Sequence, residues 1–140
     1  MYQICYASES TSDDTLLDDL AAILTEARNF NSSHYITGAL YFADGYFFQC
    51  IEGSRESLEF LMSKLKKDPR HKNLHIFETQ VLKQRMFNDW VMKYVQRHGE
   101  IQDFMHELGY SRFAPQHLTQ ENVNSLVQLL GVVLQQEETV

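Results

Sequence analysis

Phe47-Phe48-Gln49-Cys50-Ile51-Glu52-Gly53 is a stretch in which apolar residues occupy both faces of an extended chain. Successive side chains of a strand point to opposite sides, so a strand here needs a cover on each face of its sheet. Gln49 lies inside this stretch, with apolar neighbours before and after it. Burying a primary amide without a hydrogen-bond partner costs roughly 1–3 kcal/mol. We therefore expect a polar group to contact Gln49 inside the core.

The residues around this stretch predict alternating strands and helices. Asp44-Gly45 is a turn of the kind that joins hairpins, so residues 35–42 and 46–52 form two adjacent strands. Ser54 is placed to cap a helix that runs to about Lys67. The remaining pattern predicts strands over 2–8, 74–82 and 90–96 and helices over 16–30, 101–108 and 120–136, with Asp13 and Asp14 near the start of the first helix and Thr119 capping the last.

The predicted order is β-α-β-β-α-β-β, followed by two helices. Helices that connect strands imply right-handed crossovers, which place both helices on one face of the sheet. This arrangement is a ferredoxin-like α+β sandwich with a five-stranded mixed sheet. The two C-terminal helices are the remaining material that can cover the second face. We therefore expect three layers, with a C-terminal two-helix cap opposite the first two helices.

Composition limits the class of protein. The chain has 140 residues, of which 44% are hydrophobic and 12% aromatic, so we expect one folded domain and no extensive disorder. The net charge of -7 argues against nonspecific nucleic-acid binding but leaves a basic partner protein open. Cys5 and Cys50 lie in apolar runs and are expected as buried core residues. Because neither a signal peptide nor an apolar run of about 20 residues is found, we expect a soluble, cytoplasmic protein without a membrane partner.

Two histidines invite a metal site, which we do not predict. His71 and His75 are four residues apart, a spacing that shares a face only on a helix. Here they lie on a turn that leads into a strand, and no third ligand is near in the sequence.

Four polar or soft side chains are expected to converge under the first two helices. Tyr6 lies on the first strand, Gln49 on the third, and Trp90 and Met92 on a shared face of the last. A carboxamide carries two donors on its nitrogen and an acceptor oxygen. A half-turn of the amide, or a change of its tautomer, exchanges donor for acceptor with almost no change in shape. Such an element is bistable, with on the order of 1 kcal/mol for each hydrogen bond exchanged.

Several motifs, in order and spacing, resemble the BLUF domain, the blue-light sensor that uses FAD. They are Cys5-Tyr6-Ala7-Ser8, Asn31, Ile36-Thr37-Gly38-Ala39-Leu40, Phe47-Phe48-Gln49 with Ile51-Glu52-Gly53, Asp68-x-Arg70-His71-x-Asn73 and Trp90-x-Met92. The resemblance covers about residues 1–96, and the length and two-helix tail look like the short, stand-alone proteins of this family. It implies a photosensor domain over 1–97 and a helical cap or output extension over 98–140.

The resemblance also implies a set of site residues. The flavin ring would lie between the first two helices, with one edge facing Tyr6 and Gln49. The implied photoactive switch consists of Tyr6, Gln49, Trp90, Met92 and Ser8. The implied polar contacts to the cofactor are Asn31 at the carbonyl edge, and Lys64, Arg70 and His71 at polar or phosphate atoms, with Asp68 in the supporting turn. The implied apolar contacts to the ring are Ile23, Ile36 and Leu40. Phe30 is one departure, because many relatives carry a polar residue before the asparagine.

The implied function is photochemical and not enzymatic. Light would drive electron and proton transfer from Tyr6, rearrange Gln49, and signal through the last strand and C-terminal helices. The implied partner is a downstream regulatory protein, of which a transcription regulator is one candidate, and assembly with further copies of the chain stays open. Two alternatives remain: a flavin-independent enzyme or small-molecule binder on a ferredoxin-like scaffold, and a light-blind interaction module that keeps flavin as a structural ligand.

Overall fold

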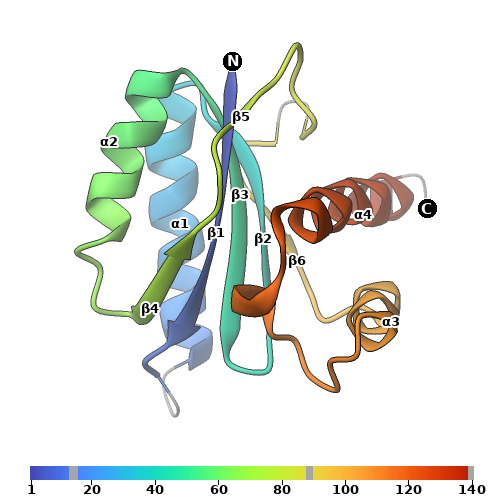
Figure 1. Ribbon diagram of the computed structural model, residues 1–140. Coiled ribbons are helices and arrows are strands. Elements are labelled where there is room, and N and C mark those ends of the chain that lie inside the picture. The colour runs from blue at the N-terminus through green and yellow to red at the C-terminus, as the bar shows by residue number, and fades with distance from the viewer. Residues whose placement is uncertain (13–15, 88–89, 139–140) are drawn as a thin grey trace.

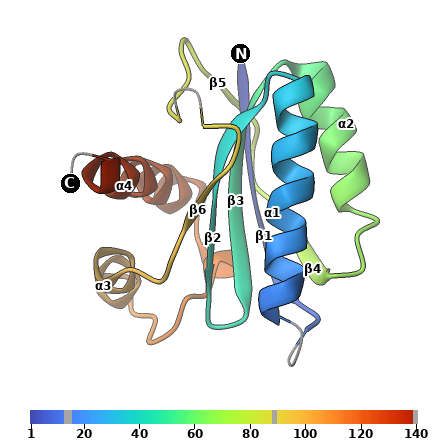
Figure 2. The same ribbon diagram turned by 180° about the vertical axis from the view of Figure 1, so that it is seen from behind.

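The computed structural model describes residues 1–12, 16–87 and 90–138, arranged in three layers. Figures 1 and 2 show α1 and α2 on one face of a central sheet and α3 and α4 on the other. The elements are β1 (Tyr2–Ser10), α1 (Leu16–Ser33), β2 (Thr37–Ala43), β3 (Tyr46–Gly53), α2 (Arg55–Leu65), β4 (His71–Ile76), β5 (Gln80–Val81), β6 (Lys93–Val95), α3 (Gly99–Glu107), a 3-10 turn (Pro115–His117) and α4 (Gln120–Glu138). This is the predicted α+β sandwich with a helical cap on its second face.

The sheet is mixed and has β1 and β3 at its centre. The strand order is β4-β1-β3-β2-β6, and β5 also pairs with β1. β3 pairs antiparallel with β1 on one side and with β2 on the other, whereas β6 runs parallel to β2. Gln49 stands opposite Tyr6 on one side and opposite Leu40 on the other. The strand pairing itself therefore places a phenol beside the buried amide.

Local chemistry explains several element boundaries. Asp44 and Gly45 both have positive φ, 53° and 84°, as a tight hairpin turn requires. Ser54 accepts from the Ser57 backbone N–H at 3.2 Å and caps α2. A Cβ on Gly38 would lie 2.2 Å from the Cys50 carbonyl oxygen, so only glycine allows this approach of β2 to β3.

Each face of the sheet has its own core, as the alternation in β1 predicts. Ile4 and Tyr6 belong to the cluster under α1 and α2, hereafter the near face. Cys5 and Ala7 belong to the larger cluster under α3 and α4, hereafter the far face. Within the described residues, none of the helices combines the length and apolar character that crossing a bilayer requires.

Some predicted boundaries are wrong. The strand expected over 74–82 is replaced by β4 and β5, and the strand expected over 90–96 is reduced to β6. Tyr35, expected as the start of a strand, has φ 55°, and β2 begins two residues later. Asp13 and Asp14, expected near the helix start, lie outside the described residues.

Trp90 and Met92 do not share a face, contrary to the sequence prediction. Met92 is buried in the near-face cluster, whereas Trp90 packs against the far-face cluster. The chain bends at Val91, before β6 begins, so the two-residue alternation of a strand does not apply to this pair. Of the four side chains expected to converge, Tyr6, Gln49 and Met92 therefore do so, and Trp90 does not.

Candidate functional site

A buried hydrogen-bonded chain connects β1, β3 and the segment before β6. Tyr6 Oη donates to Gln49 Oε1, and Gln49 Nε2 donates to Met92 Sδ at 3.6 Å. Tyr6, Gln49 and Met92 are only 4%, 3% and 2% exposed. The polar group that the sequence predicts beside Gln49 is thus the Tyr6 phenol, and the amide uses its donor and its acceptor at the same time.

Burial keeps the Tyr6 phenol in its neutral form. Desolvation raises the pKa of Tyr6 well above its usual value near 10, and the negative charge of Asp68 raises it further. His71 packs edge-on against the phenol with ring centroids 6.0 Å apart. At neutral pH, Tyr6 is therefore a hydrogen-bond donor whose proton resides on Oη.

Ser8 and His71 form a second polar pair beside this chain. The Ser8 hydroxyl lies 2.8 Å from His71 Nδ1, and His71 Nε2 lies 2.6 Å from the Leu65 carbonyl oxygen. A carbonyl can only accept, so Nε2 carries a proton directed toward Leu65, and Nδ1 shares a hydrogen bond with the Ser8 hydroxyl. Both ring nitrogens are used, which fixes β4 to the end of α2.

Arg70 connects the turn after α2 to α1. Its side chain contacts both carboxylate oxygens of Asp68, at 2.9 and 2.6 Å, and reaches Glu26 Oε2 at 2.6 Å. The hydrogen bond from Arg70 lowers the pKa of Asp68, so this carboxyl is ionised at neutral pH. Sequence reasoning predicted Asp68 and Arg70 but missed Glu26, because only the tertiary fold brings that helix position to the turn.

Asn31 is fully buried at the end of α1. Its side-chain nitrogen donates to the Val91 carbonyl oxygen at 2.6 Å. Its side-chain oxygen has no hydrogen-bond partner among the residues that the structure describes. A buried acceptor without a partner costs about 1–3 kcal/mol, so the site is complete only when a donor reaches it.

Two small cavities lie between α1, α2 and the sheet. The larger, about 110 Å³, is bordered by Gln49, Phe30, Lys64 and Arg70 among others. The smaller, about 20 Å³, reaches Tyr6, Leu40 and His71. Both cavities are lined by Ile23, Leu65, Asp68 and Arg70. A tricyclic ring exceeds these volumes, so lining side chains, the helices or the Asp68–Arg70 turn have to shift to admit one.

The packing of α1 is consistent with such movement. Of its 18 residues, only Leu20 and Asn31 are buried. Its other apolar residues, including Ile23 and Phe30, are only partly covered. A helix in a globular protein normally buries its whole apolar stripe, so α1 has apolar surface available for a ligand.

A scan against protein-family models matches residues 1–93 to the family described as "Sensors of blue-light using FAD". The match covers well over half of the 140 residues and includes the buried Tyr6–Gln49–Met92 chain. This protein belongs to the BLUF family.

Curated relatives and solved structures agree with this assignment. Photoactivated adenylate cyclase subunit beta of Euglena gracilis is 30% identical over 92 residues, which are 65% of this chain and 11% of that protein. The chain thus spans about a tenth of the length of this relative. The photo-activated state of BlsA is 42% identical and superposes with a TM-score of 0.89 over 94% of both chains. BlrB in its dark state is 27% identical, with a TM-score of 0.79 over 94% of this chain and 96% of the other.

BLUF domains use FAD, and the near face fits a flavin. The unpaired oxygen of Asn31 offers an acceptor for an N–H group, and the amide of Gln49 lines the larger cavity. Lys64 and Arg70 border the same cavity, as do Asp68 and Glu26, the two carboxylates that Arg70 contacts. Lys64 also lies over the ring of Phe30, with Nζ 4.5 Å from the centroid.

The structure brings together most of the predicted site residues of this BLUF domain. Ile23, Leu40, Lys64, Asp68, Arg70 and His71 border the cavities, and Ser8 contacts His71. Ile36 is buried in the near-face cluster but borders neither of these two cavities. Trp90 lies on the other side of the sheet. No cluster of metal-ligating side chains, such as one around His71 and His75, occurs in the described parts of the chain.

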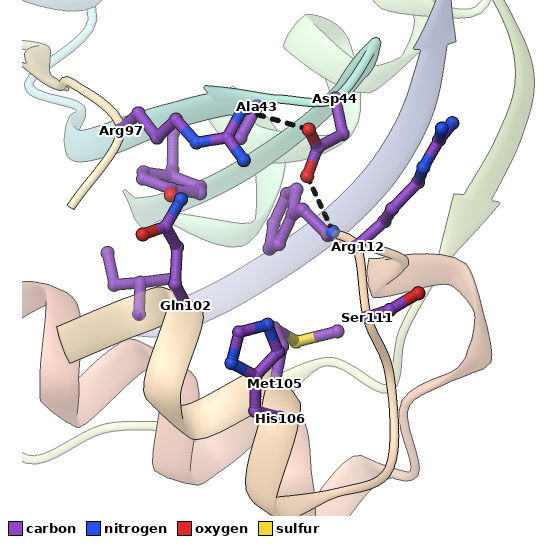
Figure 3. Close-up of a pocket in the computed structure, with 11 residues that line it drawn as sticks. Ala43, Asp44, Arg97, Gln102, Met105, His106, Ser111 and Arg112 are labelled. Atoms are coloured by element: carbon purple, nitrogen blue, oxygen red, sulfur yellow. Dashed lines mark hydrogen bonds and ion pairs between the residues drawn. The ribbon is translucent and has the colours of Figure 1, made fainter. Parts of the chain in front are cut away.

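Sequence reasoning missed a further cavity, about 290 Å³, on the far face (Figure 3). It lies where the β2–β3 turn meets α3 and the loop that follows α3. Asp44 bridges its wall by accepting from Arg97 at 2.9 Å and from the Phe113 backbone N–H at 2.8 Å. The hairpin turn therefore also holds the C-terminal cap against the sheet.

Proposed function

We propose that the Tyr6–Gln49–Met92 chain is the light-responsive switch of this blue-light sensor. The observation that carries this proposal is the buried hydrogen bond from Tyr6 to Gln49, formed between two residues paired in register on central strands. The amide has a second bond to Met92. A change at the phenol is therefore transmitted to the segment that leads into β6.

The side chains of this protein support a specific order of photochemical steps. When bound, FAD absorbs blue light and becomes a strong oxidant. Tyr6 holds its proton on Oη and is in direct contact with Gln49 Oε1. Tyr6 would give up an electron and this proton to the oxidant that bound FAD supplies and would take both back, so that its hydrogen bond to Gln49 would break and re-form. The Gln49 carboxamide then settles with donor and acceptor exchanged, and its bond to Met92 Sδ changes with it.

The same proposal assigns the surrounding residues to flavin binding. Asn31 Oδ1 would accept from the ring edge, and Lys64 and Arg70 would contact polar or phosphate atoms. Asp68 and His71 hold the turn that carries Arg70, and Ile23, Ile36 and Leu40 supply apolar surface. Because Arg70 bridges to Glu26, cofactor entry requires this bridge to open or rearrange.

We further propose that residues 1–97 are the sensor and residues 98–140 the output cap. The sensor and cap share the far-face cluster, to which Trp90 and the helices of the cap both contribute. Relatives are named photoactivated adenylate cyclase subunits, so light sensing in this family is combined with other activities. Here the proposed output is contact with a regulatory partner protein, with no catalysis by this chain, and a cytoplasmic location stays a prediction from sequence.

Difference absorption spectra of the FAD-loaded protein test the switch. Blue light should produce a reversible red shift, and Tyr6→Phe should bind FAD and abolish this shift. Tyr41→Phe is the matched control, because Tyr41 is an equally buried tyrosine of the far face. A normal red shift in Tyr6→Phe, or its loss in both variants, would contradict the assignment to Tyr6.

A further inference from the structure

Glu52 is a fully buried carboxylate that the switch itself does not use. It follows Gln49 by three residues on β3 and therefore points to the far face, whereas Gln49 points to the near face. Its Oε1 accepts from the Phe87 backbone N–H at 2.8 Å, and its Oε2 accepts from the Met86 backbone N–H at 2.9 Å. The side chain thus bonds two consecutive peptide groups of a segment more than 30 positions away in the sequence.

The carboxylate is satisfied by hydrogen bonds and not by a direct ion pair with Arg85. The Thr37 hydroxyl donates to Glu52 Oε1 at 3.1 Å and accepts from Arg85 at 2.8 Å. Arg85 also donates to the backbone oxygens of Glu52 and Tyr35, at 3.0 and 2.6 Å. The guanidinium therefore balances the buried charge through one intervening hydroxyl and fixes the same segment from outside.

The segment held by Glu52 leads directly to Met92. The Phe87 carbonyl accepts from Trp90 N–H at 3.0 Å, and the Trp90 carbonyl accepts from Gly38 N–H at 2.9 Å. Phe87 is buried in the far-face cluster, whereas Met92 reaches Gln49 on the near face. Phe87 and Met92 therefore lie on opposite sides of the sheet, and Trp90 is hydrogen-bonded to the peptide group of Phe87, whose N–H Glu52 binds.

We propose that Glu52 is a positioning residue for the light switch, acting through the hydrogen-bonded peptide groups of Met86, Phe87 and Trp90 to hold Met92 against Gln49. This inference rests on the proposed function of the Tyr6–Gln49–Met92 chain. Glu52 does not contact the switch. It binds the peptide groups of Met86 and Phe87, which precede Met92 in the sequence.

A carboxylate suits this task because Glu52 accepts each of the three side-chain hydrogen bonds that it makes with described residues, from Met86, Phe87 and Thr37. Both oxygens accept, and an ionised carboxylate has no proton that could be misplaced. A glutamine in its position would direct its NH₂ group against a backbone N–H, whichever way the amide is turned. Glu52→Gln therefore keeps the shape of the side chain and removes at least one hydrogen bond to Met86 or Phe87.

A double-mutant cycle in FAD-loaded protein tests the proposal, with the rate of thermal recovery after blue light as the readout. Glu52→Gln alone should change that rate by about threefold or more, which is typical of a coupled contact. In a Met92→Ala background the same substitution should have little further effect, because the side chain that Glu52 positions is gone. Equal effects in both backgrounds, or no effect in either, would overturn the inference.

Two controls separate this result from loss of fold and from failure of the switch. Glu56→Gln makes the same change of charge at an exposed position of α2 and should leave recovery unchanged. If Glu52→Gln does not fold, Thr37→Val removes one of the three donors at the carboxylate and is carried through the same cycle. If the wild-type protein shows no light response, the proposed switch fails; a normal response with additive mutations defeats the role of Glu52 alone.

Discussion

The two faces of the sheet each bury a glutamine that donates to a methionine sulfur, yet only one has the features of a switch. On the near face, Gln49 Nε2 lies 3.6 Å from Met92 Sδ. On the far face, Gln3 Nε2 lies 3.4 Å from Met86 Sδ. The two glutamines are similarly buried, at 3% and 4% exposed. The difference is that Gln49 also accepts from a phenol, whereas both glutamines border cavities, of about 110 Å³ at Gln49 and about 190 Å³ at Gln3.

This comparison shows that a buried amide is not enough. An amide can exchange donor and acceptor only if a neighbour can change what it offers, and Tyr6 is such a neighbour. The near face also has cavities beside α1, at Gln49 and at Tyr6, and a buried Asn31 oxygen without a partner among the described residues. The far face instead joins the sheet to α3 and α4 through a continuous apolar cluster.

The largest effect should come from removing the near-face amide. Gln49→Leu should bind FAD and lose the normal light-induced red shift, because no side chain remains to exchange its polarity. Gln3→Leu, the same substitution on the far face, should keep a red shift of normal size. Absorption spectra before and after illumination make this comparison, and an unchanged response in Gln49→Leu would defeat the amide switch.

A substitution in the far-face core is expected to lower the stability of the fold and to leave the light-induced red shift unchanged. Leu130 is fully buried in the cluster between the sheet and α4. Leu130→Ala should reduce the free energy of unfolding by about 2–5 kcal/mol through lost contacts and a cavity, while the size of the red shift stays normal. Denaturant unfolding and absorption spectra measure the two quantities. Loss of the red shift in a variant that remains folded and loaded would show that the faces are not separable.

A smaller effect is expected at the turn between α2 and β4. Because Arg70 lowers the pKa of Asp68 below 3.8, the ionised pair stabilises the fold above that pH, and this contribution is lost as the pH falls through the folded-state pKa. Asp68→Asn removes this dependence. Between about pH 6 and about pH 3, the midpoint temperature of thermal unfolding should therefore fall more steeply in wild type than in the variant. Parallel curves would exclude a stabilising role for the charged pair.

The smallest effect is expected from alkaline pH. Burial raises the pKa of Tyr6, so its phenol keeps its proton beyond the range near 10 in which exposed tyrosines ionise. The size of the red shift should stay constant from neutral pH to about pH 10 while the protein remains folded. Difference spectra over this range test the prediction. A decline centred below pH 10 would mean that Tyr6 ionises as an exposed phenol does.

Much of the fold could be predicted from sequence because local signals and periodicity agree. The turn at Asp44-Gly45, the cap at Ser54 and the strand pattern over residues 2–8 each led to the correct element. Trp90 was assigned to the wrong face, because alternation is meaningful only within a strand and the chain bends at Val91. A bend that depends on tertiary hydrogen bonds leaves no mark in the residue pattern.

The contact between Tyr6 and Gln49 could be predicted for a similar reason, whereas the contacts of Glu26 and Glu52 could not. Gln49 is conspicuous as an amide in an apolar run, and β1–β3 pairing brings Tyr6 to it. Glu26 and Glu52 look like ordinary charged residues in the sequence. Their roles depend on contacts with Arg70 and with residues 86–87, which only the folded chain creates.

Light-minus-dark infrared spectroscopy of FAD-loaded protein with isotope-labelled glutamine tests the central claim most directly. The account predicts a label-sensitive change in a glutamine carbonyl band on illumination, lost in Gln49→Leu and retained in Gln3→Leu. Absence of any label-sensitive change in wild type, or its persistence in Gln49→Leu, would contradict a switch based on the Gln49 carboxamide.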